Sequence, residues 1–275
     1  MPEEEETSGK LSVSEISVSF GGITALDGVS LEARQGEVLG IIGPNGAGKT
    51  TLFNVICGFV KPDSGTMRWR GQSLDAIRPH RLAALGIART LQGVGLFADL
   101  TVRENVMVGA QRFRRAGLVG TMLGRPRADR DERALAERAT AALERVGCAD
   151  MAESRPGQLP YAAQKRVALA RALACEPDLL LLDEPAGGLD SDEMSALADT
   201  IRSLGSSIAV MLVDHHMDLV TSVCDRMVVL DFGRVIAAGD PATVRQDPGV
   251  LEAYLGRDAE VADTTVASGT GDAQR

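Results

Sequence analysis

The chain has 275 residues, of which 29 are Lys or Arg and 38 are Asp or Glu, so its formal net charge is −9. Its content of 44% hydrophobic and 24% charged residues is ordinary for a globular protein, and the acidic balance argues against a nonspecific nucleic-acid binder, which presents basic surfaces. The longest apolar run, 208–213, is far shorter than the roughly 20 residues that cross a bilayer, which excludes an integral membrane protein.

Both ends of the chain differ in composition from its centre. Residues 1–10, MPEEEETSGK, are acidic and lack the apolar stretch of a secretory signal. Residues 258–275 are polar, small and aperiodic. We expect both ends to be disordered and residues 11–257 to form a single domain.

Short apolar runs alternate with helical patterns over 11–94 and 160–257. Val38–Ile42 is strand-like, and it is followed by one helix face at i, i+3, i+4 and i+7: Leu52, Val55, Ile56 and Phe59. The unbroken runs 179–182 and 208–213 are typical of strands covered on both faces. This alternation predicts an α/β core with a parallel sheet.

The middle of the chain has a different pattern. Residues 101–146 are rich in Ala, Arg, Glu and Leu, and no strand is predicted there. Within them, 130–146 has the spacing of an amphipathic helix, with an apolar face of Leu135, Ala139, Ala142, Leu143 and Val146. We expect residues 95–159 to form a helical subdomain inserted into the α/β core.

The cysteines and histidines argue against a metal centre. Cys57, Cys148, Cys175 and Cys224 are scattered without a CxxC pair, so we expect reduced thiols in the core of a cytosolic protein. His215 and His216 are adjacent, and side chains of neighbouring residues at a strand end are expected to point apart.

Residues 43–50 match the phosphate-binding pattern G-x-x-x-x-G-K-[ST] at every fixed position, between a predicted strand and a predicted helix. Glycines let successive N–H groups point at phosphate oxygens, and the helix N-terminus adds a favourable dipole. Lys49 is expected to reach the β- and γ-phosphates and the Thr50 hydroxyl to bind Mg²⁺. The predicted nucleotide-binding residues here are Gly43, Pro44, Asn45, Gly46, Ala47, Gly48, Lys49, Thr50 and Thr51.

A second acidic motif follows the apolar run 179–182. Asp183 and Glu184 end this predicted strand, which is expected to lie beside the phosphate-loop strand, at the sheet edge where α/β proteins bind ligands. Asp183 is expected to support Mg²⁺, and Glu184 to orient and deprotonate an attacking water. Without a phosphate loop upstream, an Asp-Glu pair after an apolar run would also be compatible with the N-cap of a helix.

Together these motifs resemble the ATP-binding subunit of an ABC transporter over about 11–256. The resemblance implies a P-loop NTPase (RecA-like) core with an antiparallel β edge and an inserted α-helical subdomain. The chain looks most like the branched-chain amino acid uptake branch, on the stretches FGGITALDGVSLEARQGEVLGIIGPNGAGKTTLFNVICGF, RTLQGVGLFADLTVRENV and GDPATVRQDPGVLEAYLG.

The resemblance implies roles for four further residues. Phe20 would stack on adenine, with a buried strand position as its alternative, and Gln92 would contact Mg²⁺ and the attacking water. His215 would sense the γ-phosphate. Asp190, in the loop 186–190, would contact the opposite subunit of an ATPase dimer.

The family signature Leu-Ser-Gly-Gly-Gln is replaced here by Leu159, Pro160, Tyr161, Ala162 and Ala163. In the family this segment caps the γ-phosphate bound by the other subunit. Pro160 has neither a hydroxyl nor an N–H, and the Cβ of Ala162 limits close approach. We expect a weakened capped site. A second departure is His216, where the family usually has Asp.

The resemblance implies a cytoplasmic ATPase, peripheral on the inner face of the membrane, that drives a separate transmembrane permease. ATP and Mg²⁺ would be its cofactors, and branched-chain or related amino acids its cargo, delivered by an extracytoplasmic solute-binding protein. The weak signature favours a heterodimer with a second ABC ATPase subunit over a homodimer. No nucleic-acid partner is expected.

Other function classes fit less well. A non-transport ABC ATPase of DNA repair or translation would need a long coiled coil or two cassettes, and a regulatory cassette with impaired hydrolysis would not need an intact Lys49, Asp183, Glu184 and His215. A P-loop kinase would not need Gln92 or His215. A GTPase would need Asn-Lys-x-Asp, which the sequence lacks.

Overall fold

The computed structural model describes residues 10–75, 77–90, 93–114 and 126–254. Gln92 lies outside these ranges, as do the predicted disordered ends apart from residue 10. No helix among the described residues combines the length and the apolarity needed to cross a membrane.

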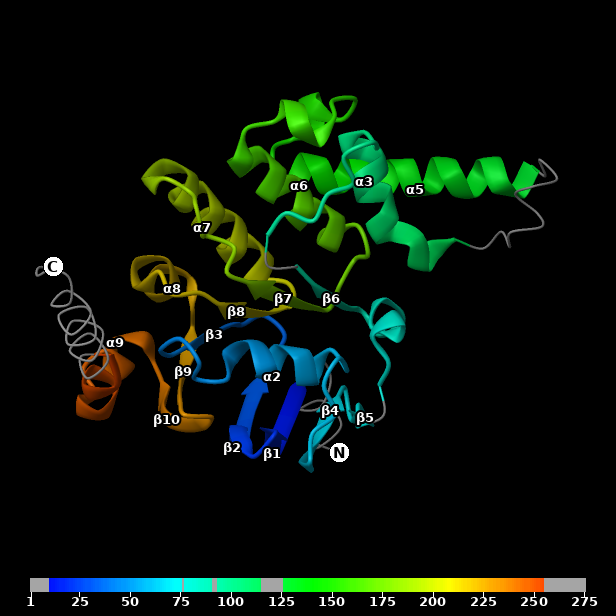
Figure 1. The fold of residues 1–275 in the computed structure, drawn as a ribbon. Helices are drawn as coiled ribbons and strands as arrows, with labels where there is room; N and C mark the ends of the chain where they lie inside the picture. The colour runs from blue at the N-terminus through cyan, green and yellow to red at the C-terminus, as the bar shows by residue number, and fades with distance from the viewer. Residues whose placement is uncertain (1–9, 76, 91–92, 115–125, 255–275) are drawn as a thin grey trace, which may run out of the picture.

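An antiparallel sheet forms one edge of the molecule (Figure 1). Its strands are β1 (Leu11–Phe20), β2 (Ile23–Ala33), β4 (Ser64–Trp69) and β5 (Gln72–Ser73), in the order β2-β1-β4-β5. Leu11, Val13, Ile16 and Val18 are buried on the inner face of β1. The predicted antiparallel β edge is therefore present.

The central sheet has the order β10-β9-β3-β8-β7-β6. Its strands are β3 (Val38–Ile42), β6 (Ile87–Arg89), β7 (Leu179–Asp183), β8 (Ala209–Val213), β9 (Arg226–Asp231) and β10 (Arg234–Gly239). All neighbours are parallel except β9 and β10. The predicted α/β core with a parallel sheet is confirmed.

One expectation about this sheet is wrong, because β7 does not lie beside the phosphate-loop strand β3. β8 lies between them and pairs with both. Every residue of β7 and of β8 is buried, as expected for strands covered on both faces, so the burial pattern of each run does not determine which of them pairs with β3. The consequence is that the end of β8 enters the candidate site between the other two strands.

Helices cover both faces of the central sheet (Figure 1). The helices of the described residues are α2 (Lys49–Ile56), α3 (Val102–Gly109), α5 (Pro126–Arg145), α6 (Tyr161–Leu173), α7 (Ser191–Gly205), α8 (Met217–Val223) and α9 (Pro241–Val244). Short 3-10 turns are η1 (Pro79–Arg81), η2 (Ala83–Leu85), η3 (Ala110–Phe113), η4 (Ala149–Met151) and η5 (Pro156–Gln158). Successive residues of β7 alternate between the two resulting cores, with Leu179 and Leu181 in one and Leu180 and Leu182 in the other.

The helix after β3 is shorter than its apolar pattern predicts. α2 ends at Ile56, and Phe59 is 59% exposed outside the helix, so its assignment to the apolar face is wrong. Gly58 turns the chain with φ +71, where a Cβ would lie 2.5 Å from the Ile77 carbonyl oxygen. The turn directs Phe59 away from the face that α2 buries.

α3, α5 and α6 pack against one another in a helical layer on the side of the central sheet opposite β1 and β2 (Figure 1). The predicted apolar face of α5 is confirmed, because Leu135, Ala139, Ala142, Leu143 and Val146 are all buried. α6 contacts both α3 and α5, so it belongs to this layer. The division of the chain into an α/β core and a helical subdomain at residues 95 and 160 stays a prediction. The four cysteines are free and buried, as expected.

Candidate active site

The phosphate-loop pattern lies between the carboxyl end of β3 and the first turn of α2. Gly43, Gly46 and Gly48 have φ values of +145, +81 and +105, which side chains rarely adopt. A Cβ on Gly43 would collide with the Leu230 carbonyl oxygen, and one on Gly48 would lie 2.6 Å from the Ala25 carbonyl oxygen. The fold therefore requires glycine at these two positions.

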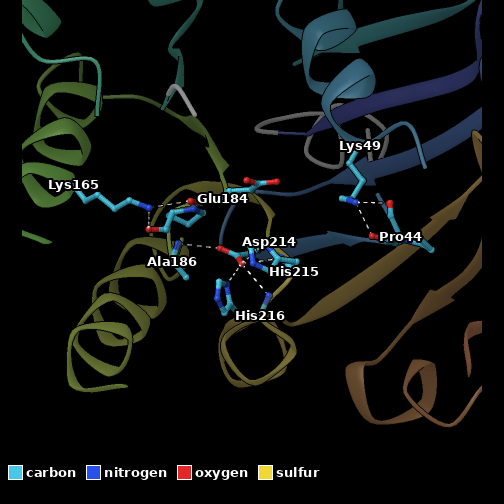
Figure 2. Close-up of polar contacts among 10 residues, drawn as sticks. Pro44, Lys49, Lys165, Glu184, Ala186, Asp214, His215 and His216 are labelled. Carbon is cyan, nitrogen blue, oxygen red and sulfur yellow. Dashed lines mark hydrogen bonds and ion pairs between the residues drawn. The ribbon is translucent and has the colours of Figure 1, made fainter. Parts of the chain in front are cut away.

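Lys49 is buried beneath this loop. Its Nζ donates to the carbonyl oxygens of Gly43 at 2.6 Å and Pro44 at 2.8 Å (Figure 2). Asn45 and Gly46 are exposed at the tip of the loop, and Ala47 is buried under it. An ammonium held inside a loop of main-chain N–H groups at a helix N-terminus is suited to a polyphosphate anion.

The residues predicted to hold Mg²⁺ sit on two elements. Thr50 is exposed in the first turn of α2, next to the half-buried Thr51, and Asp183 is buried at the end of β7. A hydroxyl and a carboxylate are the hard oxygen donors that Mg²⁺ prefers, so this donor set fits the ion. The third predicted ligand, Gln92, lies outside the described residues.

Asp183 also has a partner that sequence reasoning missed. Arg89, at the end of β6, donates from Nη2 to Asp183 Oδ2 and from Nη1 to Asn54 Oδ1, both at 2.7 Å. Its guanidinium lies 5.6 Å from the Phe53 ring centroid. The available signal was its place three residues before Gln92 in the stretch Arg-Thr-Leu-Gln.

Glu184 has a strained main chain. Its φ is +48, in the left-handed region, which disfavours a residue with a Cβ by roughly 1–2 kcal/mol. Its N–H donates to the Val213 carbonyl oxygen at 2.7 Å, and its own carbonyl accepts from Lys165 Nζ at 3.3 Å. Such strain persists where neighbouring groups hold a residue in place, and it clusters at active sites.

The two histidines after β8 do not point apart, so that expectation is wrong. Their ring centroids lie 4.1 Å from each other, because the Asp214 carboxylate draws both main-chain N–H groups and the His216 ring to one oxygen. Asp214, His215 and His216 each offer one atom of a kind that can ligate a metal ion, and these three atoms lie within 4.8 Å of one another. Since Asp214 Oδ1 already accepts three hydrogen bonds, its lone pairs are committed.

The segment that replaces the family signature begins α6. Pro160 is the N-cap residue and provides no side-chain cap. Leu159 and Ala163 are buried, Ala162 is half-buried and Tyr161 is 46% exposed. The Tyr161 ring lies against Gly188, where a Cβ would be 3.0 Å from its Cε1. The segment thus contacts the loop 186–190 of its own chain, and its role toward a second subunit stays a prediction.

Two other predicted residues occupy distinct structural positions. Phe20 is 51% exposed at the end of β1, so the alternative of a buried strand position is wrong. Asp190 caps α7, where its Oδ1 accepts from the Glu193 N–H at 2.8 Å. Stacking by Phe20 and a dimer contact by Asp190 stay predictions.

A cavity of about 480 Å³ opens between the end of β7, α6 and α7. Asp183 and Glu184 line one wall, and Ala162, Lys165 and Arg166 line another. Lys165 spans the two walls, since its Nζ also donates to the Pro185 carbonyl oxygen at 2.9 Å (Figure 2). Burial lowers the pKa of Lys165, while the carboxylates of Asp214 and Glu184 oppose this shift.

These residues meet at the carboxyl edge of the central sheet. Lys49 follows β3, Glu184 follows β7 and His215 follows β8, the strand between them. Figure 2 shows Glu184 between Lys165 on one side and Lys49 on the other. A cation, a carboxylate and an imidazole around one edge can bind a phosphorylated ligand, activate water and respond to a terminal phosphate.

Comparison with known proteins agrees with this arrangement. A profile described as ABC transporter matches residues 26–187, and one described as Branched-chain amino acid ATP-binding cassette transporter matches residues 234–260. The chain is 38% identical over 248 residues to the high-affinity branched-chain amino acid transport ATP-binding protein LivG of Salmonella typhimurium, covering 90% of this chain and 97% of that protein. It is 38% identical over 249 residues, with the same coverage, to BraF of Pseudomonas aeruginosa, which has the same description.

Solved structures are similar as well. The crystal structure of a nucleotide-free ATP-binding cassette from an ABC transporter superposes with a TM-score of 0.78 at 30% identity, over 90% of this chain and 98% of that one. The ADP conformation of MJ1267, an ATP-binding cassette of an ABC transporter, gives the same TM-score and identity over 90% of this chain and 99% of that one.

Proposed function

The chain belongs to the ABC transporter ATP-binding family, ATPases that couple ATP hydrolysis to transport, and we propose that it powers the import of branched-chain or related amino acids. The similarity to LivG over 97% of that protein's length carries the proposal. The match at residues 234–260 to the branched-chain amino acid profile supports the same cargo.

We assign ATP to the edge formed by the ends of β3, β7 and β8. The main-chain N–H groups of 43–50 and Lys49 bind the β- and γ-phosphates, so Lys49 exchanges its bonds to the Gly43 and Pro44 carbonyls for phosphate oxygens. The exposed Phe20 ring stacks on adenine, which contributes about 1–3 kcal/mol. Thr50, Asp183 and Gln92 would hold Mg²⁺, which would supply positive charge to neutralise the phosphates.

Glu184 is the proposed base for hydrolysis. Its strained main chain, held by Val213 and Lys165, limits the positions its carboxylate can take beside the phosphate loop. There it orients a water molecule in line with the γ-phosphorus and accepts its proton. His215, whose side chain is 57% exposed, senses the γ-phosphate.

We propose that the chain acts on the cytoplasmic face of the membrane with a separate transmembrane permease. ATP closes two ATPase subunits over two nucleotides, and that closure moves the permease, because ATP binds the closed state more tightly. The second subunit is a related ATPase with an intact signature, and a solute-binding protein delivers the cargo. No nucleic acid takes part.

One alternative function has its own observation. Pro160 and Ala162 in the signature segment favour a regulatory or non-transport ABC-type ATPase with impaired hydrolysis. In that case the fully assembled complex hydrolyses ATP slowly and transports nothing.

The decisive experiment is the variant Glu184→Gln, assembled with its permease and partner ATPase in lipid vesicles. We expect ATP binding to be retained and turnover to be lost. Glu144→Gln, which makes the same change at an exposed position of α5, is the control and keeps full turnover. Normal hydrolysis by Glu184→Gln removes Glu184 from its assigned role.

Uptake assays in the same vesicles test the cargo. Radiolabelled leucine, isoleucine and valine are compared with small amides and urea, with the cognate binding protein present. ATP-dependent accumulation of the three amino acids supports the proposal. Accumulation of amides or urea alone assigns the chain to a different importer.

A further inference from the structure

The turn 184–186 is held by two hydrogen bonds, one to the last residue of β8 and one to the residue that follows it. The Glu184 N–H donates to the Val213 carbonyl oxygen at 2.7 Å. Two residues on, the Ala186 N–H donates to Asp214 Oδ2 at 3.0 Å (Figure 2). The second bond is the one that depends on a side chain.

The other oxygen of the same carboxylate holds the loop of His215. Asp214 Oδ1 accepts from the N–H groups of His215 at 2.8 Å and His216 at 3.0 Å, and it lies 2.6 Å from His216 Nδ1. Asp214 is 1% exposed. A single buried carboxylate therefore joins the turn that carries Glu184 to the loop that carries His215.

His216 gives this carboxylate a donor that the usual family residue lacks. A buried carboxylate needs several donors to offset its desolvation. An Asp at 216 could only accept, whereas the His216 ring donates from Nδ1. Among the described residues, Lys165 is a cation that faces Asp214 and Glu184 from α6, and its Nζ donates to the carbonyl oxygens of Glu184 and Pro185.

We propose that Asp214, with His216 as its donor, is a positioning residue that sets the turn 184–186 relative to His215. The inference rests on the proposed role of Glu184 as the base. When His215 meets a γ-phosphate, the shared carboxylate passes the movement to Glu184 and onward to the loop 186–190. Hydrolytic geometry thus depends on the state of the sensor.

The variant Asp214→Asn tests this in the assembled transporter. The Asn side chain has one acceptor oxygen. That oxygen can accept either from the Ala186 N–H or from the N–H groups of His215 and His216, and the amide NH₂ then faces the remaining N–H donors, from which it cannot accept. We expect kcat to fall by up to about 100-fold with ATP affinity unchanged, because small misplacements of a catalytic group have effects of this size. Asp218→Asn, exposed in the first turn of α8, is the matched control and keeps wild-type kcat.

His216 provides a second pair of variants at a less buried position. His216→Gln keeps a hydrogen-bond donor and is expected to keep the wild-type kcat. His216→Phe keeps a ring but has no donor, and its kcat is expected to fall as in Asp214→Asn. Hydrogen exchange gives a readout independent of activity. Amides of 184–190 are expected to exchange faster in Asp214→Asn and His216→Phe, and those of β4 to be unchanged.

The outcomes separate this inference from the proposed function. If Glu184→Gln is inactive while Asp214→Asn and His216→Phe keep wild-type kcat and wild-type protection of 184–190, the positioning role is wrong and the base assignment stands. If Glu184→Gln is active, both are wrong. Should Asp214→Asn fail to fold, the split between His216→Gln and His216→Phe decides, and equal kcat in the two overturns the proposal.

Discussion

Arg89 and Asp183 form an ion pair inside the core, with 2.7 Å between Arg89 Nη2 and Asp183 Oδ2. Their side chains are 11% and 2% exposed. The pair joins β6, which leads toward Gln92, to β7, which leads to Glu184, and Asn54 adds α2 to the same contact. One guanidinium thus holds β6 to α2 and β7, the two elements that carry predicted site residues.

Removing this guanidinium should destabilise the protein strongly. Arg89→Met leaves the buried Asp183 carboxylate without its partner, which costs about 3–5 kcal/mol of the free energy of unfolding. Arg70→Met is the control, because the Arg70–Asp178 pair is 40% and 36% exposed, and its loss is expected to cost at most about 1 kcal/mol. Urea titration measures both, and equal losses would show that burial of the first pair has no energetic consequence.

The contact between α3 and α6 should tolerate no extra atom at Gly109. A Cβ there would collide with the Arg171 carbonyl oxygen, so Gly109→Ala forces the two helices apart and is expected to cost about 1–3 kcal/mol. Gly157→Ala, in η5 with no neighbouring atom within 4 Å, is the control and should change stability by no more than about 0.5 kcal/mol. Denaturant midpoints compare the two. Equal midpoints would contradict close packing in the helical layer.

Stability should fall at alkaline pH through the buried thiols. Burial raises the pKa of Cys224 to about 12 and that of Cys175 to about 11, whereas the pKa of a thiol in the unfolded chain is about 8.5. Between these values the unfolded state binds fewer protons than the folded state, so the stability present below the lower pKa is lost as pH rises. Unfolding titrations from pH 8 to pH 12 should show a shallower decline for Cys224→Ala than for the wild type. Identical slopes would contradict the raised pKa of Cys224.

Restoring the signature should speed hydrolysis at the partner subunit's nucleotide. Pro160→Ser returns a hydroxyl and an N–H, and Ala162→Gly removes a Cβ. If the double variant restores one charge-assisted hydrogen bond, it is expected to raise that rate about 10- to 100-fold. Single-turnover assays of the assembled transporter measure the change. Pro160→Ala, which returns the N–H alone, should give a smaller increase. An unchanged rate in the double variant would show that the present signature does not limit hydrolysis.

Local patterns in the sequence predicted most of the fold correctly. The strand Val38–Ile42 begins and ends where the apolar run does, and the apolar face of α5 is buried at every predicted position. The phosphate loop lies between β3 and α2 as its motif requires. These features depend on residues close together in the chain, where periodicity, glycine conformation and helix termini act directly.

Contacts between distant segments could not be predicted in this way. The runs of β7 and β8 are both fully buried, so no local pattern placed β8 between β7 and β3. Phe59 continued a helical spacing that the turn at Gly58 ends. The pairing of Arg89 with Asp183 spans 94 positions in the chain, and only the register of β6 beside β7 brings the two together.

The sequence by itself determined the phosphate loop, the strands around it and the family, because each is encoded in a short run of residues. The tertiary structure alone decided how the candidate site is held. Asp214 joins two loops, and Lys165 crosses from α6 to the turn of Glu184, because strand order and helix packing bring their partners within hydrogen-bond distance. Such contacts arise from packing over the whole chain, and no local pattern records them.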